Sequence, residues 1–350
     1  MNIAEFGESW REKSPVLVTG HTGFKGTWLM LLLKELGVNV VGYSLEAKAN
    51  SMYQRLKLEG VIPEIFADIR DENSVTSFLN RVQPSAIIHL AAQPLVFESY
   101  RDPKETFDIN VMGTANLLQA GSRISNLEAI LVSTTDKVYR NNNSGRKFTE
   151  ADALEGVDPY SASKVATEAV IRAWQNILNG KIRLIAGRAG NVIGGGDYSQ
   201  DRIIPDCVRA HENNLQLTVR NPQSVRPWQH VLEPLSGYLL ALGFGKELSY
   251  NFGPIESEDL TVIQVIEILQ RKLDFDFQIA NATNSPYEAE LLSLDSEMAK
   301  RNLNWQPSYS QEVAIELTAE WWKAAFEGKN LIDFSRQQVR NFISSQVANV

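Results

Sequence analysis

The sequence of 350 residues has a single cysteine and no long hydrophobic run. With Cys207 alone, no disulfide can close within the chain, and a reducing compartment is the simpler expectation. The polar start before Pro15 holds no apolar stretch of signal-peptide length, and the run WLMLLL that follows is far too short to cross a bilayer. We therefore expect a cytoplasmic protein that does not bind membranes.

Positive charge is also scarce. The chain carries 34 Lys and Arg against 42 Asp and Glu, which is a net charge of −8. This balance argues against nucleic acid as a partner, although it leaves room for an anionic small ligand held by a few local cations. Apolar residues make up 43% of the chain, so a large core can form. We predict no metal site.

What the sequence does contain is a repeated alternation of apolar strands and helices. The strand candidates are PVLVTG, VNVVGYS, EIFADI, SAIIHLAA, AILVSTT and IRLIAGRAG. This order predicts βαβ units and an α/β fold with a Rossmann-type, doubly wound parallel sheet. We expect one domain over residues 1–187, with sheet elements returning around 228–265. The loop-rich residues 188–227 and 266–350 are predicted to form a smaller, interleaved substrate lobe.

Two helix starts are unusually clear. In RDPKETF, Asp102 can cap the helix and Pro103 suits its first position. In DPYSASK, Asp158 and Pro159 repeat this arrangement, and Asn179 with the glycine after it predicts the end of that helix.

A glycine-rich turn follows the first strand. Gly20, Gly23 and Gly26 are spaced GxxGxxG, directly after a strand and at the start of a helix. Glycines there permit a tight turn and close approach of the backbone to a pyrophosphate, and the helix N-terminus supplies N–H donors. The spacing alone also fits a plain tight turn, but its position favours a dinucleotide site. The acid that usually closes the second strand and holds a ribose hydroxyl is missing, because Glu46 follows that strand by several residues.

Two further strand ends carry candidate cofactor residues. Asp68 follows the third strand, where it would either reach the adenine edge of a dinucleotide or cap the strand end. The segment HLAAQ ends the fourth strand, and its small alanines suit a backbone that lies against a flat cofactor. His89, the first residue of this segment, is expected to be a hydrogen-bonded strand histidine.

Tyr160 and Lys164 lie in the helix that Asp158 begins. The i, i+4 spacing places the phenol and the ammonium on one helix face. A neighbouring positive charge favours the phenolate, so we expect the pKa of Tyr160 to be lowered toward that of a useful general base. YxxxK is common by chance, but here it follows a dinucleotide motif and a strand that ends in hydroxyl residues.

The chain contains four motifs in the order TGHTGFKG, HLAAQ, STTDK and YSASK. Together they resemble the extended short-chain dehydrogenase/reductase family, whose members act on sugar nucleotides. The resemblance covers nearly the whole chain. Two long and compositionally unusual stretches, RAGNVIGGGDYSQDRIIPD and VRPWQHVLEPLSGYLL, narrow it to the 4,6-dehydratases of nucleotide-activated glucose. The resemblance implies an NAD-dependent lyase of deoxysugar and lipopolysaccharide synthesis, with CDP-glucose as its substrate.

For NAD, the resemblance implies residues from the glycine turn, the strand ends and the two helices described above. These residues are Gly20, Thr22, Gly23, Phe24, Lys25, Gly26, Asp68, Ile69, Leu90, Ala91, Ala92, Gln93, Asn110, Tyr160 and Lys164. NAD is the implied cofactor although the acid at the end of the second strand is missing.

The segment STTDK places three polar residues side by side at a strand end. Thr135 matches the family's hydroxyl residue, which bonds the sugar 4-hydroxyl beside Tyr160. Asp136 and Lys137 imply a dehydratase, which must also remove the C5 proton and expel the C6 hydroxyl. The implied roles are Tyr160 as base at C4, Lys137 as base at C5 and Asp136 as acid at C6, while a hydride passes from C4 to NAD and back to C6.

Other interpretations stay open. Lys137 acts as a base only if its pKa falls, which Lys164 and partial burial would favour, whereas a charged Lys137 would orient groups or stabilise an enolate. Asp136 and Lys137 would otherwise form a solvated ion pair. The alternative enzymes are a dehydratase of dTDP- or UDP-glucose and a 4-epimerase, against which Asp136 and Lys137 argue. A dinucleotide-sensing regulator would typically lack the Thr, Tyr or Lys that this chain retains.

Polar and cationic residues of the loop-rich region would neutralise the two phosphates of a nucleotide sugar. The candidates are Asn191, Arg202, Arg220, Arg226 and His230. The resemblance favours Asn191 and Arg226, while His230 would either flank the base or pack in the interior.

The resemblance also implies an oligomer. The helices that begin near Asp102 and Asp158 would pair across a twofold axis. We therefore expect a homodimer built through a four-helix bundle, or a higher oligomer.

Overall fold

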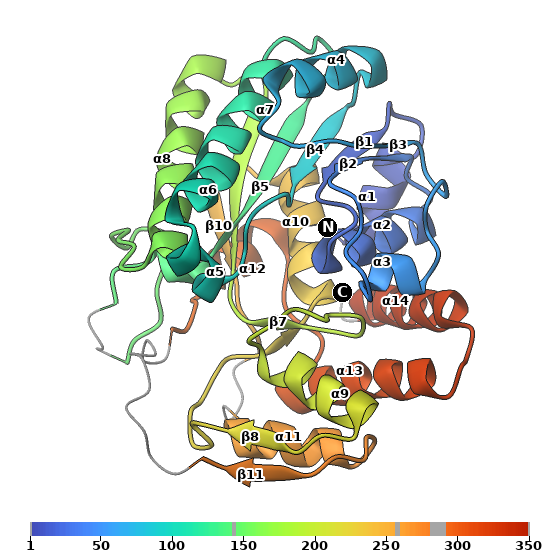
Figure 1. The fold of residues 1–350 in the computed structure, drawn as a ribbon. Coiled ribbons are helices and arrows are strands. Elements are labelled where there is room, and N and C mark those ends of the chain that lie inside the picture. The colour runs from blue at the N-terminus through green and yellow to red at the C-terminus, as the bar shows by residue number, and fades with distance from the viewer. Residues whose placement is uncertain (1, 142–144, 256–259, 281–291, 349–350) are drawn as a thin grey trace.

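A seven-stranded parallel sheet forms the centre of the protein (Figure 1). The structure is a computed structural model that describes residues 2–141, 145–255, 260–280 and 292–348. The strands lie in the order β10-β6-β5-β4-β1-β2-β3, and every neighbouring pair is parallel. Their bounds are β1 Val16–Thr19, β2 Val40–Ser44, β3 Glu64–Phe66, β4 Ala86–His89, β5 Ala129–Thr135, β6 Arg183–Ala189 and β10 Ser249–Phe252. The prediction of a doubly wound α/β fold is confirmed.

Helices cover both faces of this sheet, as Figure 1 shows. One face carries α4 (Glu72–Val82), α7 (Gly113–Gly121) and α8 (Pro159–Leu178), and the other carries α1 (Ile3–Trp10), α2 (Phe24–Glu35), α10 (Leu232–Phe244) and α14 (Leu331–Ala348). The side chains of β1 alternate between the two cores: Leu17 packs on the α4 side, whereas Val16 and Val18 pack on the α2 side. Burial on both faces explains the continuous apolar runs in the sequence.

Both predicted helix starts are confirmed. Asp102 accepts a hydrogen bond from the backbone of Glu105, and Pro103 is the first residue of α6 (Pro103–Phe107). Asp158 and Ser161 form a capping box at the start of α8, which Asn179 ends in the left-handed conformation with a φ of 45°. Asp158 and Asn179 therefore mark the two ends of α8.

A second group of elements lies below the carboxyl ends of the sheet (Figure 1). Two short parallel pairs stand here: β7 (Val192–Ile193) with β9 (Gln229–His230), and β8 (Leu217–Val219) with β11 (Phe277–Ile279). The helices of this region are α9 (Ile203–Asn213), α11 (Val262–Gln270) and α13 (Gln311–Phe326), whereas α12 (Glu297–Leu303) packs against α10 and β10. Short segments α3 (Met52–Arg55) and α5 (Val96–Arg101) complete the helices of the upper region. In the ranges that the structure describes, no helix combines the length and the apolar character that a membrane span requires.

Candidate active site

The glycine turn joins β1 to the N-terminus of α2. Gly20 has a φ of +71°, and a Cβ atom on it would lie 2.8 Å from the backbone nitrogen of Ala91. A Cβ atom on Gly26 would lie 2.1 Å from the carbonyl oxygen of Gly20. Neither position can hold a larger residue, so the backbone turns tightly beneath the N-terminus of α2. Gly23 is exposed and precedes the first helical residue, Phe24, where free N–H groups favour a phosphate.

Buried hydrogen bonds connect this turn to the ends of β2 and β4. Thr19 Oγ1 lies 2.6 Å from Nδ1 of His89, and Thr22 Oγ1 lies 2.8 Å from Oγ of Ser44. Burial lowers the pKa of His89 to about 3, so this residue is a neutral strand histidine, as expected. Ser44 occupies the end of β2, and Glu46 is exposed beyond it.

Asp68 and Ile69 follow β3 at the same edge of the sheet. The Asp68 carboxylate accepts hydrogen bonds from Nη2 of Arg70 at 2.6 Å and from Nε at 3.0 Å. These bonds lower the pKa of Asp68. Ile69 is buried, and a Cβ atom on Gly113 would lie 2.6 Å from its Cγ2 atom. Asp68 is therefore held as a carboxylate by its own ion pair.

Asn110 links the end of β4 to the helix that carries Tyr160. It lies in a π-helical turn, η1 (Asp108–Met112). Its Oδ1 accepts a hydrogen bond from the backbone of Gln93 at 2.8 Å, and its Nδ2 donates to Oγ of Ser163 at 2.8 Å. Residues 90–92, which precede Gln93, are half-buried. A π-helical turn is often found at a functional site, and here it fixes α8 against the loop after β4.

The candidate catalytic residues gather where β5 ends and α8 begins. Thr135 is the last residue of β5, and Asp136 begins a single 3-10 turn, η2 (Asp136–Val138). Thr135 Oγ1 donates to Oδ1 of Asp136 at 2.9 Å and accepts from the backbone N–H of Lys137 at 3.3 Å. The Tyr160 hydroxyl also forms a hydrogen bond with Thr135. Thr135, Asp136 and Tyr160 are buried, and Lys137 is half-buried.

The electrostatics of Tyr160 and Lys164 differ from the prediction. Burial raises the pKa of Tyr160 to about 12, the hydrogen bond with Thr135 opposes this shift, and the charge of Asp136 adds to it. Burial lowers the pKa of Lys164 to about 8, and Nζ of Lys164 donates to the carbonyl oxygen of Ser133 at 3.1 Å. The expectation of a lowered tyrosine pKa is wrong for this arrangement, because the same burial disfavours the charged forms of both groups.

Lys25 belongs to the glycine turn, yet its side chain extends toward the catalytic candidates. Its Nζ lies 5.8 Å from the centre of the Tyr238 ring. Burial lowers the pKa of Lys25 to about 7, the charges of Arg202 and Lys164 lower it further, and Asp136 opposes them. Lys25 therefore places a basic nitrogen in the same electrostatic environment as Asp136.

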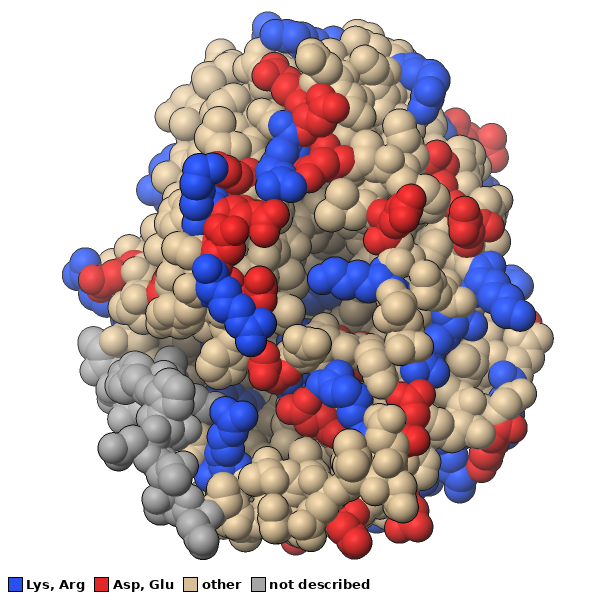
Figure 2. Space-filling view, viewed as in Figure 1, with Lys and Arg blue, Asp and Glu red and all other residues tan. Residues whose placement is uncertain are grey.

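The predicted substrate residues lie in the lower region. Arg202 precedes α9 and bonds to Oδ2 of Asp197 at 3.0 Å. Asn191 and Arg226 are half-buried, between β6 and β7 and before β9, whereas Arg220 is exposed after β8. Figure 2 shows a hollow in the middle of the viewed face, with basic side chains at its border, while acidic and basic groups are mixed over the rest of that face.

His230 lies in the core. Its side chain is fully buried, and its ring makes edge contacts with Trp28 and Tyr309 at centre distances of 5.9 and 5.8 Å. Burial lowers its pKa to about 3. This environment favours the alternative in which His230 packs in the interior.

Sequence reasoning missed one buried ion pair beside the site. Nε of Arg188 in β6 lies 2.8 Å from Oε1 of Glu168 in α8. A signal existed, because Arg188 interrupts the apolar strand IRLIAGRAG and Glu168 follows Lys164 by one helical turn.

The comparisons with known proteins agree with this geometry. A family model described as GDP-mannose 4,6 dehydratase matches residues 17–318. The chain belongs to this family. Similar proteins include the CDP-glucose 4,6-dehydratase of Salmonella typhimurium, which is 37% identical over 96% of this chain and 98% of that protein. The dTDP-glucose 4,6-dehydratase of Xanthomonas campestris is 29% identical over 87% of this chain and 92% of that protein.

Solved structures with the same fold include enzymes of two activities. The UDP-glucose 4-epimerase of Thermotoga maritima has a TM-score of 0.79 at 22% identity, covering 89% of this chain and 99% of its own. The dTDP-glucose 4,6-dehydratase of Streptomyces venezuelae, solved with NAD bound, has a TM-score of 0.78 at 24% identity, covering 90% of this chain and 98% of its own. Identity at this level shows a common fold.

Proposed function

We propose that this chain is an NAD-dependent hydro-lyase that converts CDP-glucose to CDP-4-dehydro-6-deoxyglucose and water, in the synthesis of deoxysugars such as those of lipopolysaccharide. One observation carries the proposal: Asp136 is buried at the end of β5 and bonded to Thr135, which also bonds to the tyrosine of the YxxxK pair. An epimerase needs no acid here, whereas a dehydratase must protonate the departing C6 hydroxyl. The 37% identity to a CDP-glucose 4,6-dehydratase supports the choice of substrate.

The residues of the glycine turn fit a dinucleotide. Gly20 and Gly26 admit no side chain, and the exposed Gly23 opens the N-terminus of α2 toward solvent. We assign the pyrophosphate to this N-terminus and the flat parts of NAD to the strand-end residues 68–69 and 90–93. Held there, NAD would supply reversible hydride transfer to and from the sugar.

The chain's own residues supply the proton transfers. Tyr160 accepts the proton of the 4-hydroxyl, and the hydrogen bond with Thr135 and the charge of Arg202 favour the phenolate that this step requires. The resulting 4-ketone acidifies the C5 proton, which Lys137 removes in its neutral form. Asp136 in its protonated form donates to the C6 oxygen, which leaves as water. In the alternative that the sequence left open, a charged Lys137 stabilises the enolate instead.

The lower region is proposed to hold the nucleotide sugar. Residues 1–187 with 228–265 would then form the NAD-binding domain, and residues 188–227 with 266–350 the substrate lobe, although α12 and α14 of the latter range pack against the sheet and its helices. Arg202 supports this assignment because its charge acts on both Tyr160 and Lys25, which places a cation between the lobe and the catalytic groups. Asn191, Arg220 and Arg226 are proposed to bind the diphosphate.

A homodimer is proposed from exposed apolar side chains on neighbouring helices. Phe97, Tyr100, Phe107, Met112 and Ile177 are between 37% and 66% exposed, and they come from α5, α6, η1 and α8. An exposed apolar surface on paired helices marks a protein interface. Sedimentation is expected to show a dimer that Met112→Glu dissociates, and a monomeric wild type would contradict the proposal. The buried thiol of Cys207 fits a cytoplasmic location.

The activity is tested with purified protein, NAD and, in parallel, CDP-, dTDP- and UDP-glucose. We expect a 4-keto-6-deoxy product, detected by NMR, with the highest kcat/KM for CDP-glucose. Preference for another base would change the substrate assignment, and a 4-epimer as product would support the epimerase. A protein that binds NAD but converts none of the sugars would be a regulator.

A further inference from the structure

Glu168 and Arg188 form a buried ion pair behind the proposed catalytic residues. Nε and Nη2 of Arg188 lie 2.8 Å from Oε1 and Oε2 of Glu168, respectively, so the pair is bidentate. The side chain of Arg188 is 1% exposed and that of Glu168 is 6% exposed. A buried ion pair is weak evidence for stability, because the cost of desolvating two charges is comparable to their attraction. The role of this ion pair must therefore be sought in its contacts with other residues.

The contacts of this pair enclose the catalytic turn on both sides. Thr134, which precedes Thr135, donates from Oγ1 to Oε1 of Glu168 at 2.7 Å. Tyr139, which follows the 3-10 turn Asp136–Val138, accepts from Nη1 of Arg188 at 2.8 Å. The Tyr139 hydroxyl in turn donates to Oδ1 of Asn251 in β10 at 2.7 Å. The ends of the segment 134–139 are thus held by the two members of one ion pair.

The pair also acts on the catalytic helix. Glu168 lies one turn after Lys164 on α8, and its negative charge opposes the effect by which burial lowers the pKa of Lys164. Replacing this carboxylate by a neutral group would lower the pKa of Lys164.

We infer that Glu168 and Arg188 are positioning residues that hold the turn of Thr135, Asp136 and Lys137 in its reactive geometry against α8. We assign neither residue a contact with the sugar in this role, because Glu168 bonds to Thr134, whose side chain points to the opposite face of β5 from that of Thr135. The inference rests on the proposed function for its assay. It extends that function by assigning a role to two charges that the chemistry itself does not use.

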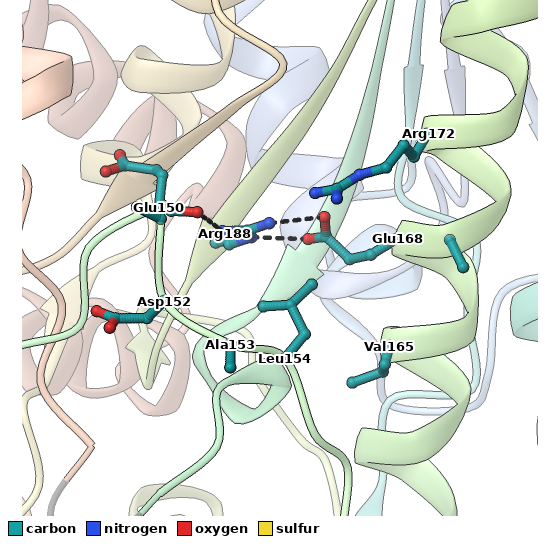
Figure 3. A pocket seen from close by; sticks show the side chains of 10 residues that line it. Glu150, Asp152, Ala153, Leu154, Val165, Glu168, Arg172 and Arg188 are labelled. Atoms are coloured by element: carbon teal, nitrogen blue, oxygen red, sulfur yellow. Dashed lines mark hydrogen bonds and ion pairs between the residues drawn. The ribbon is translucent and has the colours of Figure 1, made fainter.

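A pocket of about 480 Å³ borders this pair (Figure 3). Glu168 and Arg188 form part of its wall, and Figure 3 shows the two side chains directed toward each other. The rest of the lining is both apolar and charged: Glu150, Ala151, Asp152, Ala153, Leu154, Val165, Ala169 and Arg172. Removal of the Glu168 side chain would enlarge this pocket, and a small carboxylate that enters it could pair with Arg188. The pocket therefore offers a chemical test of the inference.

The test compares Glu168→Ala, Glu168→Gln and Thr134→Val in the full-length protein with NAD and CDP-glucose. Because loss of reactive geometry costs up to about 100-fold in rate, we expect Glu168→Ala to lower kcat by more than tenfold while KM changes little. Acetate should restore at least part of kcat in Glu168→Ala, whereas acetamide, which has the same shape and no charge, should not. Glu168→Gln should move the alkaline limb of the kcat profile to lower pH, because Lys164 then loses its proton earlier.

Controls separate this inference from a folding defect and from a failure of the proposed function. Arg172→Gln changes a residue that lines the same pocket outside the ion pair, so kcat should stay unchanged. Thr134→Val removes one hydrogen bond and keeps both charges, and it should lower kcat without a change in the pH profile. Equal rescue by acetamide, or wild-type kcat and pH profile in a folded Glu168→Gln, would overturn the inference. If the wild type converts no nucleotide sugar, the proposed function fails instead, and melting temperatures report whether each variant folds.

Discussion

A Cβ atom on Gly190 would lie 2.9 Å from Oδ2 of the Asp136 carboxylate. Gly190 follows the last residue of β6, and Asp136 follows the last residue of the neighbouring β5. Because Gly190 has a hydrogen atom in place of a Cβ atom, there is room for the carboxylate of Asp136. The position of Asp136, the proposed acid, therefore depends on the residue after β6 as well as on β5.

Gly190→Ala should displace the Asp136 carboxylate. The backbone of Gly190 does not lie in the left-handed region, so alanine can adopt it and the main effect is contact with the carboxylate. We expect kcat to fall by about tenfold or more, since a small displacement of a catalytic group is costly. Gly121→Ala on α7, where a Cβ atom would meet Leu127 at 3.3 Å, is the matched control and should retain wild-type kcat. An unchanged kcat in Gly190→Ala would show that the carboxylate tolerates displacement.

Asp136→Asn should separate oxidation from water loss. The variant keeps the shape of the side chain but cannot supply a carboxylic acid proton, so oxidation at C4 continues while the C6 hydroxyl is retained. We expect reduced cofactor to accumulate on mixing with CDP-glucose, measured by its near-ultraviolet absorbance. Asp333→Asn, an exposed aspartate on α14, is the control. An unchanged overall rate would remove Asp136 from the mechanism.

Lys137→Met should slow removal of the C5 proton. Methionine has a similar length and no basic nitrogen, so exchange of this proton with solvent deuterium, followed by NMR, is expected to fall. Lys181→Met changes an exposed lysine and should leave exchange as in the wild type. Wild-type exchange in Lys137→Met would leave Lys137 the role of orienting groups or stabilising the enolate.

Lys25→Met should change how stability depends on pH. The pKa of Lys25 is about 7 in the folded chain and about 10.5 in the unfolded chain, so the folded state binds fewer protons within this window. The free energy of unfolding is therefore not reduced by Lys25 above pH 10.5, and it decreases as the pH falls from 10.5 toward 7, because the unfolded chain then binds the proton more tightly. We expect Lys25→Met to be more stable than the wild type at pH 7, with a difference that shrinks as pH rises in urea unfolding. A difference independent of pH would contradict this assignment.

His89 and His230 should make the protein sensitive to acid. Burial lowers the pKa of each to about 3, below the unfolded value of 6.5, so stability falls as pH decreases through this window. The loss amounts to about 2 kcal/mol per histidine at pH 5. His230→Phe replaces an imidazole that packs against Trp28 and Tyr309, so it should weaken the pH dependence of the unfolding free energy between pH 6.5 and 4. The same pH dependence in this variant as in the wild type would show that His230 does not contribute.

Local patterns in the sequence were enough to predict the sheet and its helices. Strand alternation, the spacing of Gly20 and Gly26 and the caps Asp102 and Asp158 depend on neighbouring residues, and the structure bears each of them out. The polar residues of STTDK were also predicted to stand at a strand end, because parallel strands open at their carboxyl ends into a ligand crevice.

By itself, the sequence determined the fold class and the chemical types that meet at the site. Only the tertiary structure decided the charge environment of those groups and what holds them. The pKa of Tyr160 rises instead of falling, Lys25 reaches the surroundings of Asp136, and Glu168 bonds to Arg188 across 20 residues of chain. Desolvation and long-range pairing depend on which distant segments pack together, and neither is a property of adjacent residues.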